Sequence, residues 1–499
     1  MALDNKIKGI LSLISGVLIQ LLIGNLFSFP NLIPYYKSFL YYKNGKNEII
    51  TERELYFIAP VGIFVHNTFP SMTGYLDKLL GIRILTIIGV LSLLSSQLIM
   101  YFYIDYYLLI ISYFLFGFCG SLTYFQTLKN CWKYFPNKKG LISGIIFSSF
   151  GLSSFIFTSL ADLIINKDSE TEDKNGYYTE EISSKFLDYI KFYIICIIIM
   201  GTFSSILCFP YQERVNTIKI IEFENEDVED INLTKESNDE TNRNKFSEGL
   251  ADEEKKGEIV VEKKDVDEDK LTLKQSLSSL EFYKCLTVAG CTLIFGFLLS
   301  NTYRSFGIKR IKEHELGIQI LSKAFTLLNT FSRLGWGLIY DKFGFKIPYV
   351  LICINQLICG SLIYLSSQNV YTYIIVVCCG VLSYAGHIIL FPNLIHNLFG
   401  VDNSVIILGI CGIFAGISCI FGPILTLFII ENDDDYLKIY LIGAAPTIIS
   451  LILTFSIKVK KELNKEEKVE KKEKEEKEDD KNEDENEKIV DRYSDIKEN

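Results

Sequence analysis

The stretch GLIYDKFGFK, residues 337–346, has a near copy in GYLDKLLGIR, residues 74–83. Each copy carries glycine, an Asp-Lys step, a second glycine and a base, and each joins two long apolar runs. Glycine lets neighbouring helices approach closely, and a carboxylate can bind the N-terminal end of a nearby helix. We interpret the copies as two matching gates that break and re-form. Their candidate residues are Gly74, Asp77, Lys78 and Arg83, and Gly337, Asp341, Lys342, Gly344 and Lys346.

Apolar runs long enough to span a membrane fill most of the remaining chain. The protein has 499 residues, of which 49% are hydrophobic. About 20 apolar residues cross a hydrocarbon core of about 30 Å. Twelve such runs occur, six on each side of a charged stretch, so the sequence predicts an all-α membrane protein of two pseudo-symmetric six-helix bundles. The predicted spans are 9–34, 55–80, 82–104, 106–131, 139–165, 186–210, 281–304, 316–340, 346–367, 370–397, 404–430 and 435–457.

Charged residues gather in two segments, although the net charge of the chain is only -10. The predicted organisation is an N-terminal bundle (1–210), a linker (211–280), a C-terminal bundle (281–457) and a tail (458–499). The linker and tail have too few large apolar residues to offset the entropy of ordering, which predicts disorder. An even number of spans puts both termini and the linker on one side, which we expect to be the cytoplasm. No residue in either segment indicates a partner or a particular membrane.

Motifs of other protein classes are missing from the sequence. The 12 cysteines fall almost entirely within apolar runs, without CxxC or zinc spacing, and are expected to pack as small apolar side chains. No pairing of nucleophile with base and no phosphate loop is present. We therefore expect no enzyme activity, no metal, no cofactor and no nucleic-acid partner; the expected environment is the lipid bilayer.

The repeated loop, at corresponding places in two six-span halves, resembles the signature of the major facilitator superfamily of secondary transporters. Two further junctions resemble its branch of oxalate:formate antiporters and monocarboxylate transporters. These are WKYFPNKKGLISGIIFSSFGLSSFIF (132–157) and FPNLIHNLFG (391–400), the latter followed by Gly409, Gly416 and Gly422-Pro423. The resemblance implies the major facilitator fold and secondary active or facilitative transport of small organic anions, such as lactate, pyruvate, formate or oxalate.

Arg333 interrupts an otherwise apolar helix, where a charge costs about 2.5–3.5 kcal/mol unless it has a partner or a task. The branch places an arginine four residues before the glycine of span eight, which is Gly337 here, and uses it to bind the substrate carboxylate. A guanidinium offers a fixed fork of donors for this. The alternative is an arginine paired with a structural carboxylate.

Four more residues are candidates for substrate binding. Asn329 lies one helical turn before Arg333, with a structural amide between helices as the alternative. Tyr124 stands where the branch has a cavity tyrosine, unless it only packs. Asn31 replaces the lysine of the branch's FPK stretch. His387 could titrate near neutral pH and restore coupling to a proton, or serve as a hydrogen-bonded packing residue.

Two other functions stay open at this point. The chain could carry amino acids or another small metabolite, although no buried acid is evident to bind an ammonium group. It could also be a transporter-like receptor or scaffold that acts through the linker and tail.

Overall fold

The computed structural model describes residues 4–46, 55, 58–103, 105–168, 170, 173, 176–212, 272–311, 315–429 and 435–458. The chain divides into two units, one formed by Met1–Tyr211 with Leu271–Asn499 and the other by Gln212–Lys270. All the helices below belong to the first unit, so the two predicted bundles form one compact body. Most of the predicted linker and nearly all of the predicted tail lie outside the described residues.

The N-terminal bundle begins with a continuous helical path from Asn5 to Lys43, longer than the predicted span 9–34. A 3₁₀ segment and Pro30 and Pro34 lie within this path, and Pro bends or tightens a helix because it lacks an amide donor. The helices of this bundle are α1 (Asn5–Ile23), η1 (Gly24–Ser28), α2 (Phe29–Lys43), α4 (Ile58–Thr68), α5 (Pro70–Phe102), α6 (Tyr106–Tyr134), α7 (Lys139–Ile165), α8 (Glu180–Ser184) and α9 (Phe186–Leu207).

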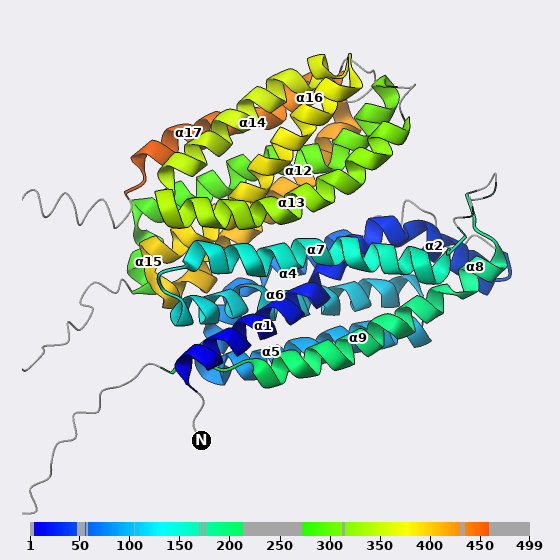
Figure 1. Cartoon of the computed structure of the whole chain (residues 1–499), viewed down its shortest axis with the longest axis horizontal. Helices are drawn as coiled ribbons and strands as arrows, with labels where there is room; N and C mark the ends of the chain where they lie inside the picture. The colour runs from blue at the N-terminus through cyan, green and yellow to red at the C-terminus, as the bar shows by residue number, and fades with distance from the viewer. Residues whose placement is uncertain are drawn as a thin grey trace, which may run out of the picture. The chain divides into compact units, whose positions relative to one another are not determined.

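The C-terminal bundle begins earlier than predicted. Helix α11 lies inside the range expected to be a disordered linker, because Thr272 and Gln275 form a reciprocal capping box that starts a helix there. The helices of this bundle are α11 (Leu273–Ser278), α12 (Leu280–Arg310), α13 (Glu315–Phe343), α14 (Lys346–Ser366), α15 (Val370–Ile429), α16 (Asp435–Ala444) and α17 (Pro446–Ser456). Figure 1 shows the two bundles meeting through α7 and α13, with α15 contacting α4 and α5 on the other side.

Two long helices each contain a break between two spans; in α5 the part before the break forms one span together with α4 (Ile58–Thr68), and in α15 each part is long enough to span alone. Gly81 in α5 has a φ of 75° and Gly400 in α15 has a φ of 79°, a conformation that glycine adopts without steric cost. Nine of the described helices are long and apolar enough to cross a membrane. Helix α13 adds another, with polar residues predicted to face a cavity. Counting α5 and α15 as two spans each confirms the predicted architecture of twelve.

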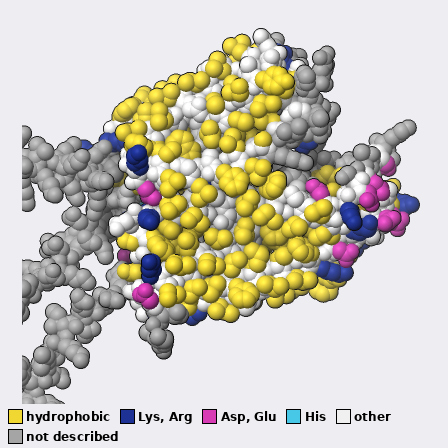
Figure 2. All heavy atoms as spheres, in the orientation of Figure 1, with side chains coloured by type: hydrophobic (Ala, Val, Ile, Leu, Met, Phe, Trp, Pro, Cys, Tyr) yellow, Lys and Arg dark blue, Asp and Glu magenta, His cyan; other side chains and the backbone are white. Residues whose placement is uncertain are grey.

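Apolar side chains cover the outer surface of the helices, as a bilayer requires. On α9, for example, Ile195, Ile199 and Phe203 are each more than half exposed. Figure 2 shows hydrophobic side chains over most of the face in view, with charged side chains gathered at its two ends. The lipid surroundings predicted from the sequence therefore fit this surface.

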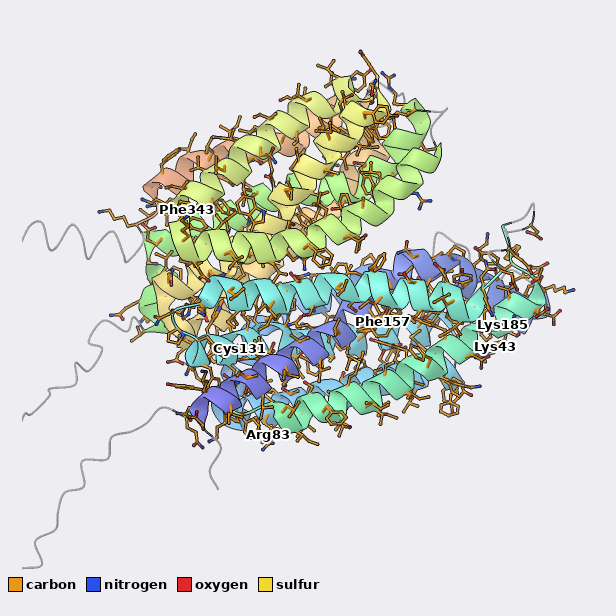
Figure 3. All side chains as sticks on the ribbon, in the orientation of Figure 1. Lys43, Arg83, Cys131, Phe157, Lys185 and Phe343 are labelled. Atoms are coloured by element: carbon orange, nitrogen blue, oxygen red, sulfur yellow. The ribbon has the colours of Figure 1, made fainter. Side chains whose placement is uncertain are left out.

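Both copies of the repeated loop lie at one end of the bundles, which we call the loop end. Figure 3 shows Arg83 and Phe343, one from each copy, at this end and Lys43 and Lys185 at the opposite end. Contacts between the bundles gather towards the loop end, where glycines allow the backbones to touch. A Cβ added at Gly140 of α7 would lie 2.2 Å from the carbonyl oxygen of Gly337 on α13. Close helix crossing at small residues is the usual way to join helices in lipid.

We expect Gly140→Ala to destabilise the contact between the bundles by about 1–3 kcal/mol, since the new methyl group must push two backbones apart. The matched control is Gly335→Ala on α13, where an added Cβ meets no atom within 4 Å. The measurement is the apparent melting temperature of each purified protein in detergent. Equal melting temperatures for Gly140→Ala and the wild type would contradict this packing.

Candidate functional site

A cavity of about 270 Å³ lies between the bundles. Segments η1, α4, α6 and α7 line it from the N-terminal bundle, and α12, α13 and α15 line it from the C-terminal bundle. Its wall is mainly apolar and aromatic, and the described lining residues include no Asp or Glu. The cavity therefore offers a mainly apolar surface with a limited set of polar side chains, which besides the predicted residues are His66, Asn67, Ser154, Thr326 and Tyr384. Four of the five predicted binding residues line it, namely Arg333, Asn329, Tyr124 and His387.

Arg333 is the one charged side chain among the described lining residues. It is only 4% exposed. Its Nη1 donates a hydrogen bond of 2.6 Å to the carbonyl oxygen of Phe147 on α7, and its Nη2 lies 3.5 Å from Asn329 Oδ1. Its Nε has no partner among the described residues, and none of their carboxylates forms an ion pair with it. The alternative of a structural salt bridge has no support in the described part of the chain.

Gly151 makes the contact of Arg333 with the opposite bundle possible. The Phe147 carbonyl stands one helical turn before Gly151. A Cβ at Gly151 would lie 2.9 Å from Thr330 Oγ1 and 3.2 Å from Arg333 Nη1. The missing side chain therefore leaves room for the guanidinium to reach a helix carbonyl. Gly151 lies in the stretch 132–157 that resembles the transporter branch, but nothing in the sequence indicated this role for it.

Tyr124 is 8% exposed, and its ring packs against Phe147 and Phe150 at centroid distances of 4.8 Å and 5.0 Å. Its hydroxyl has no hydrogen-bond partner among the residues that the structure describes, so the hydroxyl is available to a ligand. Asn329 lies one turn from Arg333 on α13, as expected, and its side-chain oxygen faces the guanidinium. Both residues thus stand beside the only cationic group described in the wall.

His387 is held by a chain of polar groups within the C-terminal bundle. Its Nδ1 lies 2.7 Å from the Tyr349 hydroxyl, and that hydroxyl donates to Thr292 Oγ1 at 3.1 Å. His66 faces the cavity from the N-terminal bundle, 5% exposed, with an Nδ1 that has no described partner. His66 was not among the predicted binding residues, because a lone histidine among apolar residues is no specific signal.

Asn31 stands apart from the other predicted residues. Its side chain is exposed, its Nδ2 is 3.5 Å from Thr158 Oγ1, and it does not line the cavity. Asn31 is the third residue of α2, whereas Phe27 in the preceding 3₁₀ segment does line the cavity. The structure therefore gives no reason to group Asn31 with Arg333.

The second copy of the loop forms a contact between the bundles. The Asp341 carboxylate accepts hydrogen bonds from the backbone amides of Gly140 (2.7 Å) and Leu141 (2.9 Å), at the start of α7. A carboxylate there satisfies free amides and meets the positive end of the helix dipole. Gly344, with a φ of 73°, ends the loop before α14. Lys342 and Lys346 flank this turn.

The first copy makes different contacts. The Asp77 carboxylate forms a salt bridge of 2.9 Å with Lys129 of its own bundle. Arg83 donates to the carbonyl oxygens of Ser205 and Ile206 at the end of α9, and Lys78 is exposed. Gly74 still lies against the other bundle, since a Cβ there would be 2.3 Å from the Ile406 side chain.

A one-residue shift explains this difference. The two glycines of each copy are seven residues apart, but Asp77 follows Gly74 by three positions, whereas Asp341 follows Gly337 by four. One residue turns a side chain by about 100° around a helix. Asp77 therefore corresponds in position to Tyr340, and its carboxylate points to Lys129 instead of crossing to the other bundle.

The structure shows further polar contacts at the loop end that the sequence did not predict. The Ser143 hydroxyl of α7 accepts hydrogen bonds from Trp132 Nε1 and Asn393 Nδ2, both at 3.0 Å, and so joins α6 with α15. The ring of His396 on α15 lies 4.7 Å from that of Trp132. Lys133 and Asp402 add an ion pair of 3.2 Å between the bundles. Such pairs between distant residues leave no pattern in one sequence.

Comparisons with solved structures find the same fold in sugar transporters. The fucose:proton symporter FucP of Escherichia coli, in a variant form, matches with a TM-score of 0.60 and 10% identity over 91% of this chain and 100% of its own. FucP in an outward conformation gives 0.59 and 11%, covering 90% and 98%. The proton:xylose symporter XylE bound to 6-bromo-6-deoxy-D-glucose gives 0.57 and 10%, covering 91% and 95%. At such identities the likeness concerns the fold alone.

No curated protein matches the sequence. The sequence profile of the Major Facilitator Superfamily matches residues 22–423, with a second match over residues 282–492. These ranges cover most of both bundles, including the cavity and both loop copies. Together with the paired six-helix bundles, this match shows that the chain belongs to the major facilitator superfamily.

Proposed function

We propose that this transporter carries small organic anions and that Arg333 binds their carboxylate. The observation that carries the proposal is a buried guanidinium in the cavity between the bundles, with an Nε that no described residue satisfies. A buried charge without a counter-ion is costly, and an anionic substrate would supply that counter-ion. Candidate substrates are monocarboxylates such as lactate and pyruvate, and formate or oxalate.

The geometry leaves one edge of the guanidinium for the substrate. Nη1 is held by the Phe147 carbonyl at 2.6 Å, whereas Nη2 has only a long contact of 3.5 Å and Nε has none. The Nε and Nη2 edge is a fork that matches the two oxygens of a carboxylate. Asn329 and the Tyr124 hydroxyl stand beside it as further hydrogen-bonding groups.

The same contact explains how binding favours movement. Arg333 belongs to the C-terminal bundle and Phe147 to the N-terminal bundle, so separation of α13 from α7 breaks their hydrogen bond. In an empty carrier, loss of this hydrogen bond leaves the buried guanidinium with fewer hydrogen-bond partners. A bound carboxylate keeps the charge paired during the movement, so rocking of the two bundles is easier for the loaded carrier.

The Asp341 carboxylate is the proposed gating group at the loop end, because it joins the two bundles there. Opening at this end requires its carboxylate to leave the amides of Gly140 and Leu141. We place the loop end and both termini in the cytoplasm, since that keeps the charged linker and tail on one side without translocation. His387 is the proposed binding site of a co-transported proton, because its Nδ1 is engaged by Tyr349 while its ring faces the cavity.

The sugar transporters of similar fold offer a weaker analogy for the substrate. A sugar is recognised through many hydroxyl groups, whereas the described wall here is mainly apolar. A neutral sugar would also leave the Arg333 charge without a counter-ion. An amino acid fits less well than a simple anion, because the described wall has no carboxylate for its ammonium group.

We expect Arg333→Lys and Arg333→Ala to weaken anion uptake by about 10-fold to 100-fold, because they remove charge-assisted hydrogen bonds worth about 1.5–3 kcal/mol. The measurement is uptake of labelled lactate, pyruvate, formate and oxalate into proteoliposomes at two external pH values. Arg310→Lys is the matched control, since Arg310 lies against the Tyr364 ring outside the cavity. Unchanged uptake of every anion in both Arg333 variants would sink the proposal.

Exchange should be faster than net uptake, by about tenfold or more, because return of the empty carrier breaks the contact of Arg333 with Phe147 without replacement. The measurement compares uptake of labelled anion into proteoliposomes that are empty or preloaded with the same unlabelled anion. Equal rates would show that the empty carrier returns freely and that this contact does not couple loading to movement.

Gly151→Ala should weaken anion binding by roughly tenfold, because the new methyl group would strain the position of Arg333 by about 1–3 kcal/mol. Gly335→Ala on α13 again serves as the control. Isothermal titration of the purified proteins with the best transported anion gives the affinities. An unaltered affinity in Gly151→Ala would mean that Arg333 does not need its contact with the Phe147 carbonyl.

A further inference from the structure

The wall of the cavity next to Arg333 is a cluster of rings from the N-terminal bundle. The His66 ring lies 4.8 Å from that of Tyr124 and 5.7 Å from that of Phe150, and the rings of Tyr124 and Phe147 stack at 4.8 Å. All four residues line the cavity. These rings pack against one another, and the faces of Phe147 and Phe150 give this side of the cavity an apolar surface.

Rings also line the side of the C-terminal bundle. Phe391 stacks on His387 at 5.3 Å with an angle of 13°, and Phe325 stacks on Tyr303 at 4.5 Å with an angle of 4°. Phe391, His387 and Phe325 are lining residues. The cavity thus presents Phe rings from both bundles, namely Phe147, Phe150, Phe325 and Phe391, beside the Arg333 cation.

The volume of the cavity and the polarity of its wall together limit which anions can bind in it. The volume of about 270 Å³ is just below the range of about 300–1,000 Å³ that is common for pockets of drug-sized ligands. Formate or oxalate could occupy the Arg333 fork but would leave the rings in contact with water. An apolar group attached to the carboxylate would displace that water, which is favourable in proportion to the apolar area buried.

We infer that the cavity selects monocarboxylates that carry a bulky apolar group, such as a phenyl ring. In this arrangement the carboxylate lies on the Nε and Nη2 edge of Arg333, and the apolar group packs between Phe150 and the rings of the C-terminal bundle. The inference rests on the proposed function, because it uses Arg333 as the anion site. It narrows the substrate class by specifying the group attached to the carboxylate, which the Arg333 charge alone does not select.

Three compounds test each part of the inference on the purified full chain in detergent by isothermal titration. They are 3-phenylpropionate, propionate, which lacks the ring, and phenylalanine, which adds an ammonium group to the first. We expect 3-phenylpropionate to bind at least about tenfold more tightly than propionate, because the ring is buried. Phenylalanine should bind at least about tenfold more weakly than 3-phenylpropionate, because its ammonium group loses water without gaining a carboxylate.

Two phenylalanine variants make the test specific. Phe150→Leu should weaken the binding of 3-phenylpropionate by about threefold or more while changing propionate by less than twofold. Phe203→Leu on α9, where Phe203 is 55% exposed on the lipid side, should change neither. This pair separates loss of the ring surface from a general effect of shortening an aromatic side chain.

The outcomes distinguish failure of the inference from failure of the proposed function. Equal or tighter binding of propionate, lost in Arg333→Ala, would overturn the apolar selectivity and keep the anion site. Phenylalanine binding as tightly as 3-phenylpropionate would also overturn the inference. If none of the three compounds, nor lactate, formate or oxalate, shows binding that depends on Arg333, the anion site itself fails.

Discussion

The buried charge of Arg333 is the constraint on which the rest of the site depends. A guanidinium that is 4% exposed in a bundle surrounded by lipid must have its donors satisfied or its charge balanced. Protein groups satisfy only part of it, through the Phe147 carbonyl and a long contact to Asn329. Nothing described balances its charge. In the proposed function, an anionic substrate supplies this missing counter-ion.

The contact that holds Arg333 also links the site to the gate. Arg333 and Asp341 lie on the same helix, α13, about two turns apart, and both bind backbone groups of α7. The crossing of these helices depends on Gly140, Gly144 and Gly151, since a Cβ at any of them would lie within 3.0 Å of α13 atoms. Movement of α13 away from α7 therefore breaks the Asp341 contact and the Arg333 contact together. Helix α13 can therefore couple the cavity to the loop end directly, without a further group between them.

The sequence predicted the parts of this protein that depend on composition and local pattern. Twelve spans, the repeated loop and the membrane surface all follow from apolar runs and glycine spacing, and Arg333 was identifiable because a charge in such a run is exceptional. The sequence could not predict contacts between distant residues. Phe147 binds Arg333 through its backbone carbonyl, and Gly151 leaves room for this contact because it has no side chain. Asn31 was grouped with Arg333 by resemblance, but its side chain is exposed and does not line the cavity. Helix α11 was missed because its capping box lies inside a charged segment.

The shift between the two loop copies makes the two sides of the interface unequal. On the α7 and α13 side, the exposed Asp341 carboxylate accepts hydrogen bonds from two backbone amides at the start of α7, and hydrogen bonds to a charged acceptor are stronger than neutral ones. On the other side, Asp77 turns inward to Lys129, and the ion pair between Lys133 and Asp402 has an Asp402 side chain that is 50% exposed, so it contributes little. Gly409 and Gly412 also pack closely against the N-terminal bundle on this side, since an added Cβ would lie 2.0 Å from Ser71 N and 2.2 Å from the Asn67 carbonyl oxygen. In the proposed mechanism, opening at the loop end separates α7 from α13, which also holds Arg333, so this movement breaks the contacts of Asp341 and Arg333 in one step.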